Sequence, residues 1–216
     1  MQEILGNISS ALQLGKAKVV KELVEQALAE SIPAKDILEQ GLLPGMDIIA
    51  VKFQKNEVYV PEVLIAARAM NAGTSLLKPY LAESGVQAVG KAIIGTVKGD
   101  LHDIGKNLVR MMLEGKGIEV VDLGVDVSPE KFLEAWRNEK PTVVALSALL
   151  TTTMGEMKNI VDAFVAEGVR DDVVIMVGGA PVTDSYRESI GADIYTSDAA
   201  SAAEAAKQAI LERKSA

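Results

Sequence analysis

The sequence of 216 residues contains no cysteine. Disulfides, thiolate zinc sites, iron–sulfur clusters and cysteine nucleophiles are therefore excluded. Aromatic residues make up only 4% of the chain, too few for the base-stacking surface of a single-strand-binding protein, and the formal net charge of −8 repels polyanions. We therefore expect no nucleic acid partner.

Long apolar runs are also missing. No stretch approaches the roughly 20 apolar residues of a membrane span, and residues 1–18 carry apolar side chains at helical spacing, unlike the uninterrupted run of a signal peptide. We therefore expect a cytoplasmic protein without a membrane partner. Histidine occurs once, as His102, so any imidazole chemistry must use that residue.

Hydrophobic residues make up 49% of the chain, enough for a sizeable core. The first eighty or so residues have the pattern of five helices in a small bundle, with apolar side chains at the spacing of one helix face in residues 17–30. Proline and glycine mark the expected breaks. Pro33 begins a short helix, Gly41 with Pro44 ends it, and Pro61 begins a longer helix that Pro79 ends.

After residue 85 the pattern changes to short β-branched runs, each followed by about ten or more residues of helical pattern. This alternation predicts a flavodoxin-like (Rossmann-like) five-stranded parallel sheet with flanking helices. The expected strands are 91–97, 118–124, 142–148, 173–179 and 192–197. We therefore predict an α + α/β protein, with an N-terminal helical bundle cap over residues 1–85 and a ligand-binding sheet domain over residues 86–216.

Ligands of such sheets bind beyond the carboxyl ends of the strands. The first expected strand runs directly into Asp100-Leu101-His102-Asp103-Ile104-Gly105. An isolated D-x-H-x-x-G is a weak signal, because ordinary residue frequencies produce one in roughly one to a few per cent of chains this long. Taken alone, His102 is more readily a solvated or helix-capping loop residue than a ligand.

Two further motifs lie at fixed distances from the first. After Gly105 and 41 intervening residues comes Ser147-Ala148-Leu149, and after 28 more comes Gly178-Gly179, each at the end of an expected strand. Together the three motifs resemble the cobalamin signature D-x-H-x-x-G, S-x-L, G-G of base-off corrinoid proteins. Residues 58–73 look like the helical cap of methionine synthase and of methanogen and acetogen methyltransferase corrinoid proteins. The chain is thus identified as a member of the methyltransferase corrinoid proteins.

The resemblance implies specific roles around the histidine. His102 would be the lower axial ligand of the cobalt in cobalamin, replacing the cofactor's own base in a base-off, His-on arrangement. Asp100 would accept a hydrogen bond from its imidazole, and Thr153 would extend this proton relay where methionine synthase has serine. Thr151 or Thr152 in the same run could substitute for Thr153.

The displaced base and its nucleotide tail would lie in a slot between sheet and helices, lined by Gly105, Gly178 and Gly179, with the Ser147 hydroxyl bonding the base. Alternatively, the glycines make tight turns, Ser147 bonds nearby backbone, and Thr196 and Ser197 cap a helix instead of lining the slot. The full set of expected cofactor contacts is Asp100, His102, Asp103, Ile104, Gly105, Ser147, Leu149, Thr151, Thr153, Gly178, Gly179, Thr196 and Ser197.

An apolar lid over the upper corrin face would come from the helical domain. Its candidates, which are equally well explained as ordinary bundle core, are Tyr59, Val60, Val63 and Met70. Three other large side chains have no motif support and are expected to be packing residues: Trp136, Met154 and Met157.

The resemblance implies methyl carriage. Cobalt(I) would accept a methyl group from a substrate bound to a partner methyltransferase, and a second methyltransferase would pass it to tetrahydrofolate or coenzyme M. A reductive activase would rescue oxidised cobalt. Because no substrate domain remains after both regions are assigned, turnover by the chain alone is not expected, and a homo-oligomer stays open.

Two other functions use the same histidine signature. The small subunit of an adenosylcobalamin mutase lacks a helical cap, and a cobalamin-dependent sensor or regulator normally adds a basic DNA-reading module. A flavodoxin-like interaction domain without a cofactor is a third alternative. The upper ligand of the cobalt would separate the enzyme functions, since methyl or water indicates carriage and adenosyl indicates a mutase.

Overall fold

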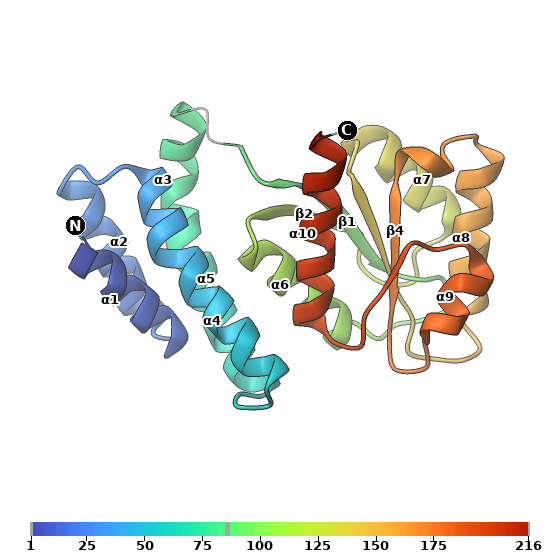
Figure 1. Cartoon of the computed structure of the whole chain (residues 1–216), viewed down its shortest axis with the longest axis horizontal. Coiled ribbons are helices and arrows are strands. Elements are labelled where there is room, and N and C mark those ends of the chain that lie inside the picture. The colour runs from blue at the N-terminus through green and yellow to red at the C-terminus, as the bar shows by residue number, and fades with distance from the viewer. Residues whose placement is uncertain (1, 85–86, 216) are drawn as a thin grey trace. The chain divides into compact units, whose positions relative to one another are not determined.

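The structure is a computed structural model that describes residues 2–84 and 87–215. The chain divides into two compact units, one built from the N-terminal helices and the other from the sheet with its flanking helices (Figure 1). The expected fold class is confirmed. The expected boundary between residues 85 and 86 lies outside the described residues. No helix within the two described ranges is long and apolar enough to cross a bilayer.

The helical unit follows from amphipathic patterning. In the first helix, for example, the buried residues Ile4, Leu5, Ile8 and Leu12 share one face. Its elements are α1 (Gln2–Gln13), α2 (Ala17–Ala29), α3 (Ala34–Asp36), a π-helix (Ile37–Leu42), α4 (Leu43–Gln54) and α5 (Val60–Glu83).

The prediction that Gly41 and Pro44 end a helix is wrong, because α3, the π-helix and α4 follow one another without a break. Pro44 lies in the first turn of α4, where its missing N–H is tolerated. The glycines serve packing: a Cβ at Gly45 would lie 3.1 Å from the Ser9 carbonyl oxygen, and one at Gly41 would lie 3.3 Å from Ile8 Cγ2. Both glycines therefore let α1 approach closely.

The prediction that Pro79 ends the long helix is also wrong, because α5 continues to Glu83. Proline removes the hydrogen bond to the carbonyl four residues earlier, which here belongs to Ser75. Ser75 is exposed, so water can satisfy that carbonyl. The helical bonding resumes after the proline, with the Ser84 N–H donating to the Tyr80 carbonyl at 3.1 Å.

The second unit contains a five-stranded sheet in the order β2-β1-β3-β4-β5, with every neighbouring pair parallel. This order is that of flavodoxin-like folds, in which a ligand crevice forms where the strand order reverses, here between β1 and β3. The strands are β1 (Gly90–Thr96), β2 (Ile118–Asp122), β3 (Val143–Ser147), β4 (Val174–Gly178) and β5 (Ile194–Tyr195).

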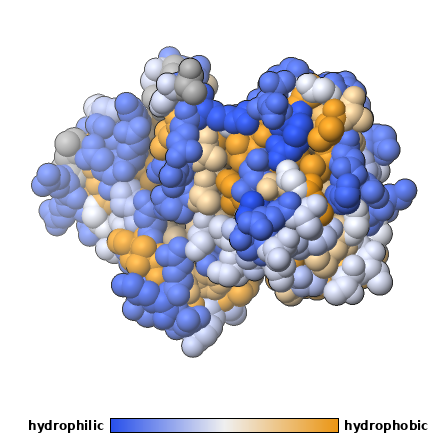
Figure 2. All heavy atoms as spheres, turned by 45° about the vertical axis from the view of Figure 1, so that its right-hand side comes forward, coloured by the Kyte–Doolittle hydropathy of each residue, from blue (hydrophilic) through white to orange (hydrophobic). Residues whose placement is uncertain are grey.

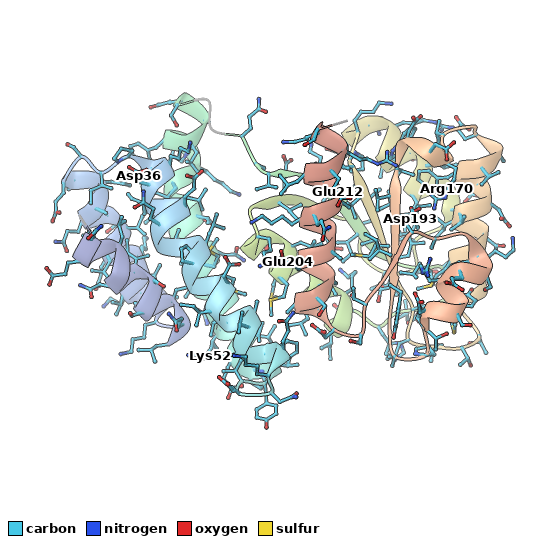
Figure 3. All side chains as sticks on the ribbon, viewed as in Figure 1. Asp36, Lys52, Arg170, Asp193, Glu204 and Glu212 are labelled. Carbon is cyan, nitrogen blue, oxygen red and sulfur yellow. The ribbon has the colours of Figure 1, made fainter. Side chains whose placement is uncertain are left out.

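Helices cover both faces of this sheet, with α6 and α10 on one side and α7 and α8 on the other (Figure 1). Arg170 and Asp193, labelled in Figure 3, form an ion pair of 2.8 Å between the loops that precede β4 and β5. The helical elements are α6 (Ile104–Gly115), α7 (Pro129–Glu139), α8 (Gly155–Ala166), a 3-10 turn (Arg170–Asp172), α9 (Asp184–Ile190) and α10 (Ala199–Ser215).

The main core of this unit lies between the sheet and α7 and α8. Phe132 and Phe164 are fully buried there, and Trp136 packs edge-on against Phe164 with ring centroids 5.8 Å apart. Met157 is buried in the same cluster and Met154 packs against it. The expectation that these tryptophan and methionine residues are packing residues is confirmed. The face shown in Figure 2 carries many hydrophilic side chains, with hydrophobic groups between them.

Candidate functional site

The D-x-H-x-x-G motif forms the loop from β1 to α6, at the carboxyl edge of the sheet. The loop begins with a tight turn, in which the Asp100 N–H donates to the Val97 carbonyl at 3.1 Å. Gly99, the third residue of this turn, has a φ of +81°, a conformation that favours glycine. The turn directs the Asp100 side chain back under the loop.

Asp100 is completely buried, and its carboxylate is surrounded by donors. Its Oδ1 accepts from the His102 N–H at 3.0 Å and lies 2.7 Å from His102 Nδ1. Its Oδ2 accepts from the N–H groups of Leu149 and Leu150, at 2.8 and 3.2 Å, and lies 3.0 Å from the Thr153 hydroxyl. Burial raises the pKa of Asp100, but these hydrogen bonds outweigh burial and hold the pKa well below its usual range.

The Asp100 carboxylate determines which nitrogen of His102 is available. An ionised carboxylate can only accept, so in the neutral imidazole Nδ1 carries the proton and Nε2 keeps its lone pair. The His102 side chain is 51% exposed. Metal-binding histidines in proteins commonly have this arrangement, in which a carboxylate holds the nitrogen that does not bind the metal.

Thr153 extends the hydrogen-bonded group into the interior. It is buried, and its hydroxyl lies 3.0 Å from Asp100 Oδ2 and 2.9 Å from the Leu150 carbonyl oxygen, so its single proton can donate to either. Thr151 and Thr152 are exposed. Of the three threonines in this run, only Thr153 contacts Asp100 within the described part of the chain.

Apolar side chains surround His102 at the surface. Leu101 and Ile104, on the histidine loop, are 72% and 73% exposed, and Leu149 and Leu150, on the loop after β3, are also exposed. Exposed apolar clusters on soluble proteins usually mark a binding surface. Ile104 and Leu149 are among the contacts expected from the sequence, whereas Leu101 and Leu150 are not. Both are apolar residues in loops at the ligand edge, and that pattern could have indicated them.

The glycines of the signature fall into two groups. A Cβ at Gly105 or Gly178 would meet no atom within 4 Å, so both leave open space. Gly179 has a φ of +132°, and a Cβ there would lie 1.8 Å from the Ala148 carbonyl oxygen, so the backbone itself requires glycine. Ser147, beside Gly178 in the sheet register, is half-buried, and its hydroxyl takes part in no hydrogen bond among the described residues.

Two further candidates, Thr196 and Ser197, lie just before the start of α10. Asp198 caps α10 through its bonds to the N–H and hydroxyl of Ser201, at 2.8 and 2.7 Å, so the capping alternative does not explain Ser197. Ser197 is exposed, and the Thr196 hydroxyl donates to the Asp198 carbonyl at 3.2 Å. Contact of either residue with a cofactor stays a prediction.

The first turn of α6 is fastened by polar contacts. Asp103 is exposed, and its Oδ2 accepts from the Asn107 side chain at 3.1 Å. Lys106 is buried, and its Nζ lies 2.6 Å from both carboxylate oxygens of Asp122, at the end of β2. Burial raises the pKa of Asp122, but the hydrogen bonds from Lys106 and the Gly124 N–H, together with the charges of Lys106 and Arg110, outweigh burial and lower that pKa. Sequence reasoning missed this ion pair, which no local pattern indicates.

Two other residues outside the signature hold the histidine loop. The Thr96 hydroxyl, completely buried at the end of β1, donates to the His102 carbonyl at 2.8 Å. Asp126 Oδ1 accepts from the Gly99 N–H at 2.7 Å, and the Asp126 N–H donates to the Asp100 carbonyl at 3.0 Å. The sequence analysis missed both residues because their partners depend on how the chain folds.

In the helical unit, Val63 and Met70 are buried, Val60 is partly buried and Tyr59 is exposed. Burial favours ordinary core roles for Val63 and Met70. Contact of the four residues with a bound ring stays a prediction.

The flavodoxin-like sheet and the carboxylate-held histidine at its switch point define a cofactor-binding α/β protein whose loop is suited to a metal. Comparison with known proteins identifies the cofactor. Residues 90–207 match the family described as B12 binding domain, and residues 4–78 match a second family with the same description. The chain therefore belongs to the family of B12-binding corrinoid proteins, and the cofactor is a corrinoid, as the sequence indicated.

Relatives match nearly the whole chain. It is 40% identical over 211 residues to the trimethylamine corrinoid protein of Methanosarcina barkeri, covering 97% of each protein. It is 37% identical over 211 residues to dimethylamine corrinoid protein 3 of Methanosarcina acetivorans, covering 98% of this chain and 99% of the relative.

Two solved structures of similar proteins agree with this family assignment. The methanol:cobalamin methyltransferase complex of Methanosarcina barkeri matches with a TM-score of 0.87 and 30% identity, over 97% of this chain and 80% of that one. A cobalamin-binding protein of Desulfitobacterium hafniense matches with a TM-score of 0.78 and 31% identity, over 95% of this chain and 98% of that one.

Proposed function

We propose that this protein is a corrinoid methyl carrier, which receives a methyl group through one methyltransferase and delivers it to another. The observation that supports this function best is the half-exposed His102 imidazole, whose Nδ1 is held by the buried Asp100 carboxylate and whose Nε2 bonds to no described residue. Relatives along the whole chain are named corrinoid proteins of methylamines, which supports methyl carriage as the use of this site.

The residues of the site fit a base-off, His-on corrinoid. When bound, a corrinoid supplies a cobalt atom that can accept and release a methyl group. His102 Nε2 would bind this cobalt, and Asp100 would keep the proton on His102 Nδ1. Thr153 would donate a hydrogen bond to Asp100 and so extend the proton relay that begins at His102. Neutral imidazole whose second nitrogen is held by a carboxylate is a good ligand for such a metal.

Open space and apolar surface complete the fit. Gly105 and Gly178 leave room where a side chain would otherwise stand. The half-buried Ser147 hydroxyl, which bonds to no described residue, could bond a displaced base. The exposed Leu101 and Ile104 would lie against the ring. Covering these side chains would remove apolar surface from water, at about 25 cal/mol per Å².

The partners follow from the methyl route. A substrate-specific methyltransferase is supported by the similarity to the methanol:cobalamin methyltransferase complex, and the names of the relatives favour a small methylated substrate such as a methylamine. The acceptor methyltransferase would serve tetrahydrofolate or coenzyme M, and a reductive activase would restore oxidised cofactor. Because residues 4–78 match a B12-binding family, the cap-less mutase subunit is disfavoured.

The single histidine makes the test direct. The protein is loaded with cobalamin, reduced to the cobalt(II) form and studied by electron paramagnetic resonance, with natural-abundance and ¹⁵N-labelled histidine. Nitrogen coupling that changes with the label and disappears in His102→Ala is the expected result. Nitrogen coupling that is the same in the natural-abundance and ¹⁵N-labelled samples comes from the cofactor's own base and would contradict His-on binding.

Methyl carriage is tested separately. Protein carrying methylcobalamin should lose its methyl group to tetrahydrofolate or coenzyme M when the acceptor methyltransferase encoded nearby in the genome is added. Isolation of the native protein with an adenosyl upper ligand would instead indicate radical chemistry and overturn the proposed function.

A further inference from the structure

The backbone of His102 is held as firmly as its ring. Its N–H donates to Asp100 Oδ1 at 3.0 Å, its Nδ1 lies 2.7 Å from the same oxygen, and its carbonyl accepts from the Thr96 hydroxyl at 2.8 Å. Nε2 is therefore the one polar atom of His102 that these contacts leave unengaged. Asp100 accounts for two of the three contacts and Thr96 for the third.

Thr96 is well placed to hold that carbonyl. It is the last residue of β1 and is completely buried. Its backbone is fully engaged, since its N–H donates to the Gly124 carbonyl and its own carbonyl accepts from the Val127 N–H, each at 3.0 Å. Both bonds hold the Thr96 backbone to the loop after β2, and on the other side Thr96 is paired with Ser147 of β3 in the sheet register.

The two anchors act at different points of the residue. Asp100 fixes the ring and the N–H of His102 from within the loop, whereas Thr96 fixes its carbonyl from the sheet. With both in place, the backbone on either side of the His102 Cα is held, and the direction of the side chain follows from it. Without the Thr96 hydroxyl, the His102 carbonyl would lose its bond to β1, while Asp100 would still hold the N–H and the ring.

We propose that Thr96 is a positioning residue, which holds the His102 carbonyl so that Nε2 stands ready to bind the cobalt of a corrinoid. This inference rests on the proposed His-on binding. Thr96 touches neither the metal nor the ring; it acts through His102 alone. Loss of its hydroxyl should weaken ligation by His102 more than it weakens binding of the corrinoid as a whole, which apolar surface and tail contacts also support.

The test compares Thr96→Val, which keeps the side-chain shape without the hydroxyl, with Thr96→Ser, which keeps the hydroxyl. Thr142→Val is the matched control, because Thr142 precedes β3 at the opposite edge of the sheet. Each variant is loaded with cobalamin and reduced to cobalt(II). The resonance spectrum gives the ratio of His-ligated to unligated cobalt, and titration with cobalamin gives the dissociation constant.

A net hydrogen bond corresponds to a change of about twofold to tenfold in an equilibrium constant. Thr96→Val should therefore lower the His-ligated ratio about twofold to tenfold, while Thr96→Ser and Thr142→Val stay near the wild type. A ratio in Thr96→Val equal to the wild type would overturn the inference, as would a fall of the same size in Thr96→Ser. If Thr96→Val does not fold, Thr96→Ala is judged by the same ratio.

Two further measurements distinguish loss of this positioning role from a general loss of stability and from a failure of His-on binding itself. Urea unfolding of the cofactor-free variants detects a general loss of stability; a merely structural role would lower stability and affinity together and leave the His-ligated ratio of the bound fraction unchanged. Absence of histidine coupling in the wild type would contradict the proposed His-on binding itself. Wild-type coupling together with an unaffected Thr96→Val variant would contradict only the role of Thr96.

Discussion

Replacing Asp100 with asparagine should move the proton of the His102 imidazole from Nδ1 to Nε2. Asparagine has the size of aspartate but offers one acceptor oxygen and one NH₂ donor. The Oδ2 position faces three donors, the N–H groups of Leu149 and Leu150 and the Thr153 hydroxyl, so the amide oxygen belongs there. The NH₂ group then occupies the Oδ1 position and faces His102.

The imidazole can adapt to this change by changing its tautomer, whereas the backbone N–H of His102 remains a donor. In Asp100→Asn the ring accepts from the NH₂ group only if its Nδ1 has lost its proton, which then resides on Nε2. A hydrogen bond to a charged group contributes about 1.5–3 kcal/mol, so the tautomer ratio should change by a factor of at least about ten. The His102 N–H is left facing a donor, which should cost about 1–3 kcal/mol of stability.

Nitrogen NMR of cofactor-free protein labelled with ¹⁵N-histidine measures this directly. Because His102 is the single histidine, its two ring nitrogens need no assignment by mutation. Spectra recorded from about pH 7 to about pH 9 separate the two neutral tautomers from the imidazolium form, in which both nitrogens carry protons. Urea unfolding of the same samples gives the loss of stability.

The expected result is a proton on Nδ1 in the wild type and on Nε2 in Asp100→Asn. A wild-type protein with its proton on Nε2 would refute the argument, because Asp100 Oδ1 would then lack the donor that the 2.7 Å contact requires. An unchanged tautomer in a folded Asp100→Asn variant would refute it equally. Thr153→Val is the control: it removes a donor to Oδ2 and should leave the His102 tautomer unchanged.

The remaining predictions concern space and charge. Gly179→Ala should destabilise the cofactor-free protein by more than about 3 kcal/mol in urea unfolding, because its Cβ would meet the Ala148 carbonyl at a φ of +132°. Gly178→Leu should fold almost normally yet bind cobalamin about tenfold more weakly in a titration, and equal affinity would contradict the slot. Lys106→Met should destabilise the protein by about 1–3 kcal/mol at pH 7, a discounted figure because Asp122 is partly exposed. Because the folded-state pKa of Asp122 is lowered, its contribution is present above the unfolded pKa of about 3.9 and is lost as pH falls below it. The gap between wild type and Lys106→Met should therefore shrink from pH 7 to about pH 3, and a constant gap would contradict the ion pair.

Periodicity was sufficient to predict most of the fold. Apolar spacing of three and four gave the helices of the first unit, and short β-branched runs gave the five parallel strands, because burial of one face imposes these patterns on local sequence. The errors were at Gly41, Pro44 and Pro79. Each is a helix breaker by local rules, but contact with α1 at Gly41, a place in the first turn of α4 at Pro44 and a solvated carbonyl at Pro79 let the helices continue. Local sequence does not show these circumstances.

At the site, the spacing of the three motifs was sufficient to single out Asp100, His102 and the glycines as residues of one ligand edge. The resemblance pointed to Thr153 but left Thr151 and Thr152 as substitutes, and only the folded structure shows that Thr153 is the one that contacts Asp100 among the described residues. The spacing also treated Gly105, Gly178 and Gly179 alike. Only backbone geometry separates a glycine that leaves open space from one whose Cβ would collide with a carbonyl.

The sequence alone determined which residue can offer an imidazole, because there is one histidine, and where it lies, because the carboxyl end of a buried strand is a ligand edge. Tertiary structure decided what that histidine can do. Asp100 and Leu149 are 49 residues apart and meet because β1 and β3 pair in parallel, which places the loops after both strands side by side. The same pairing buries Asp100 among donors, and it is these long-range contacts that hold the Asp100 carboxylate ionised, His102 Nδ1 protonated and Nε2 free.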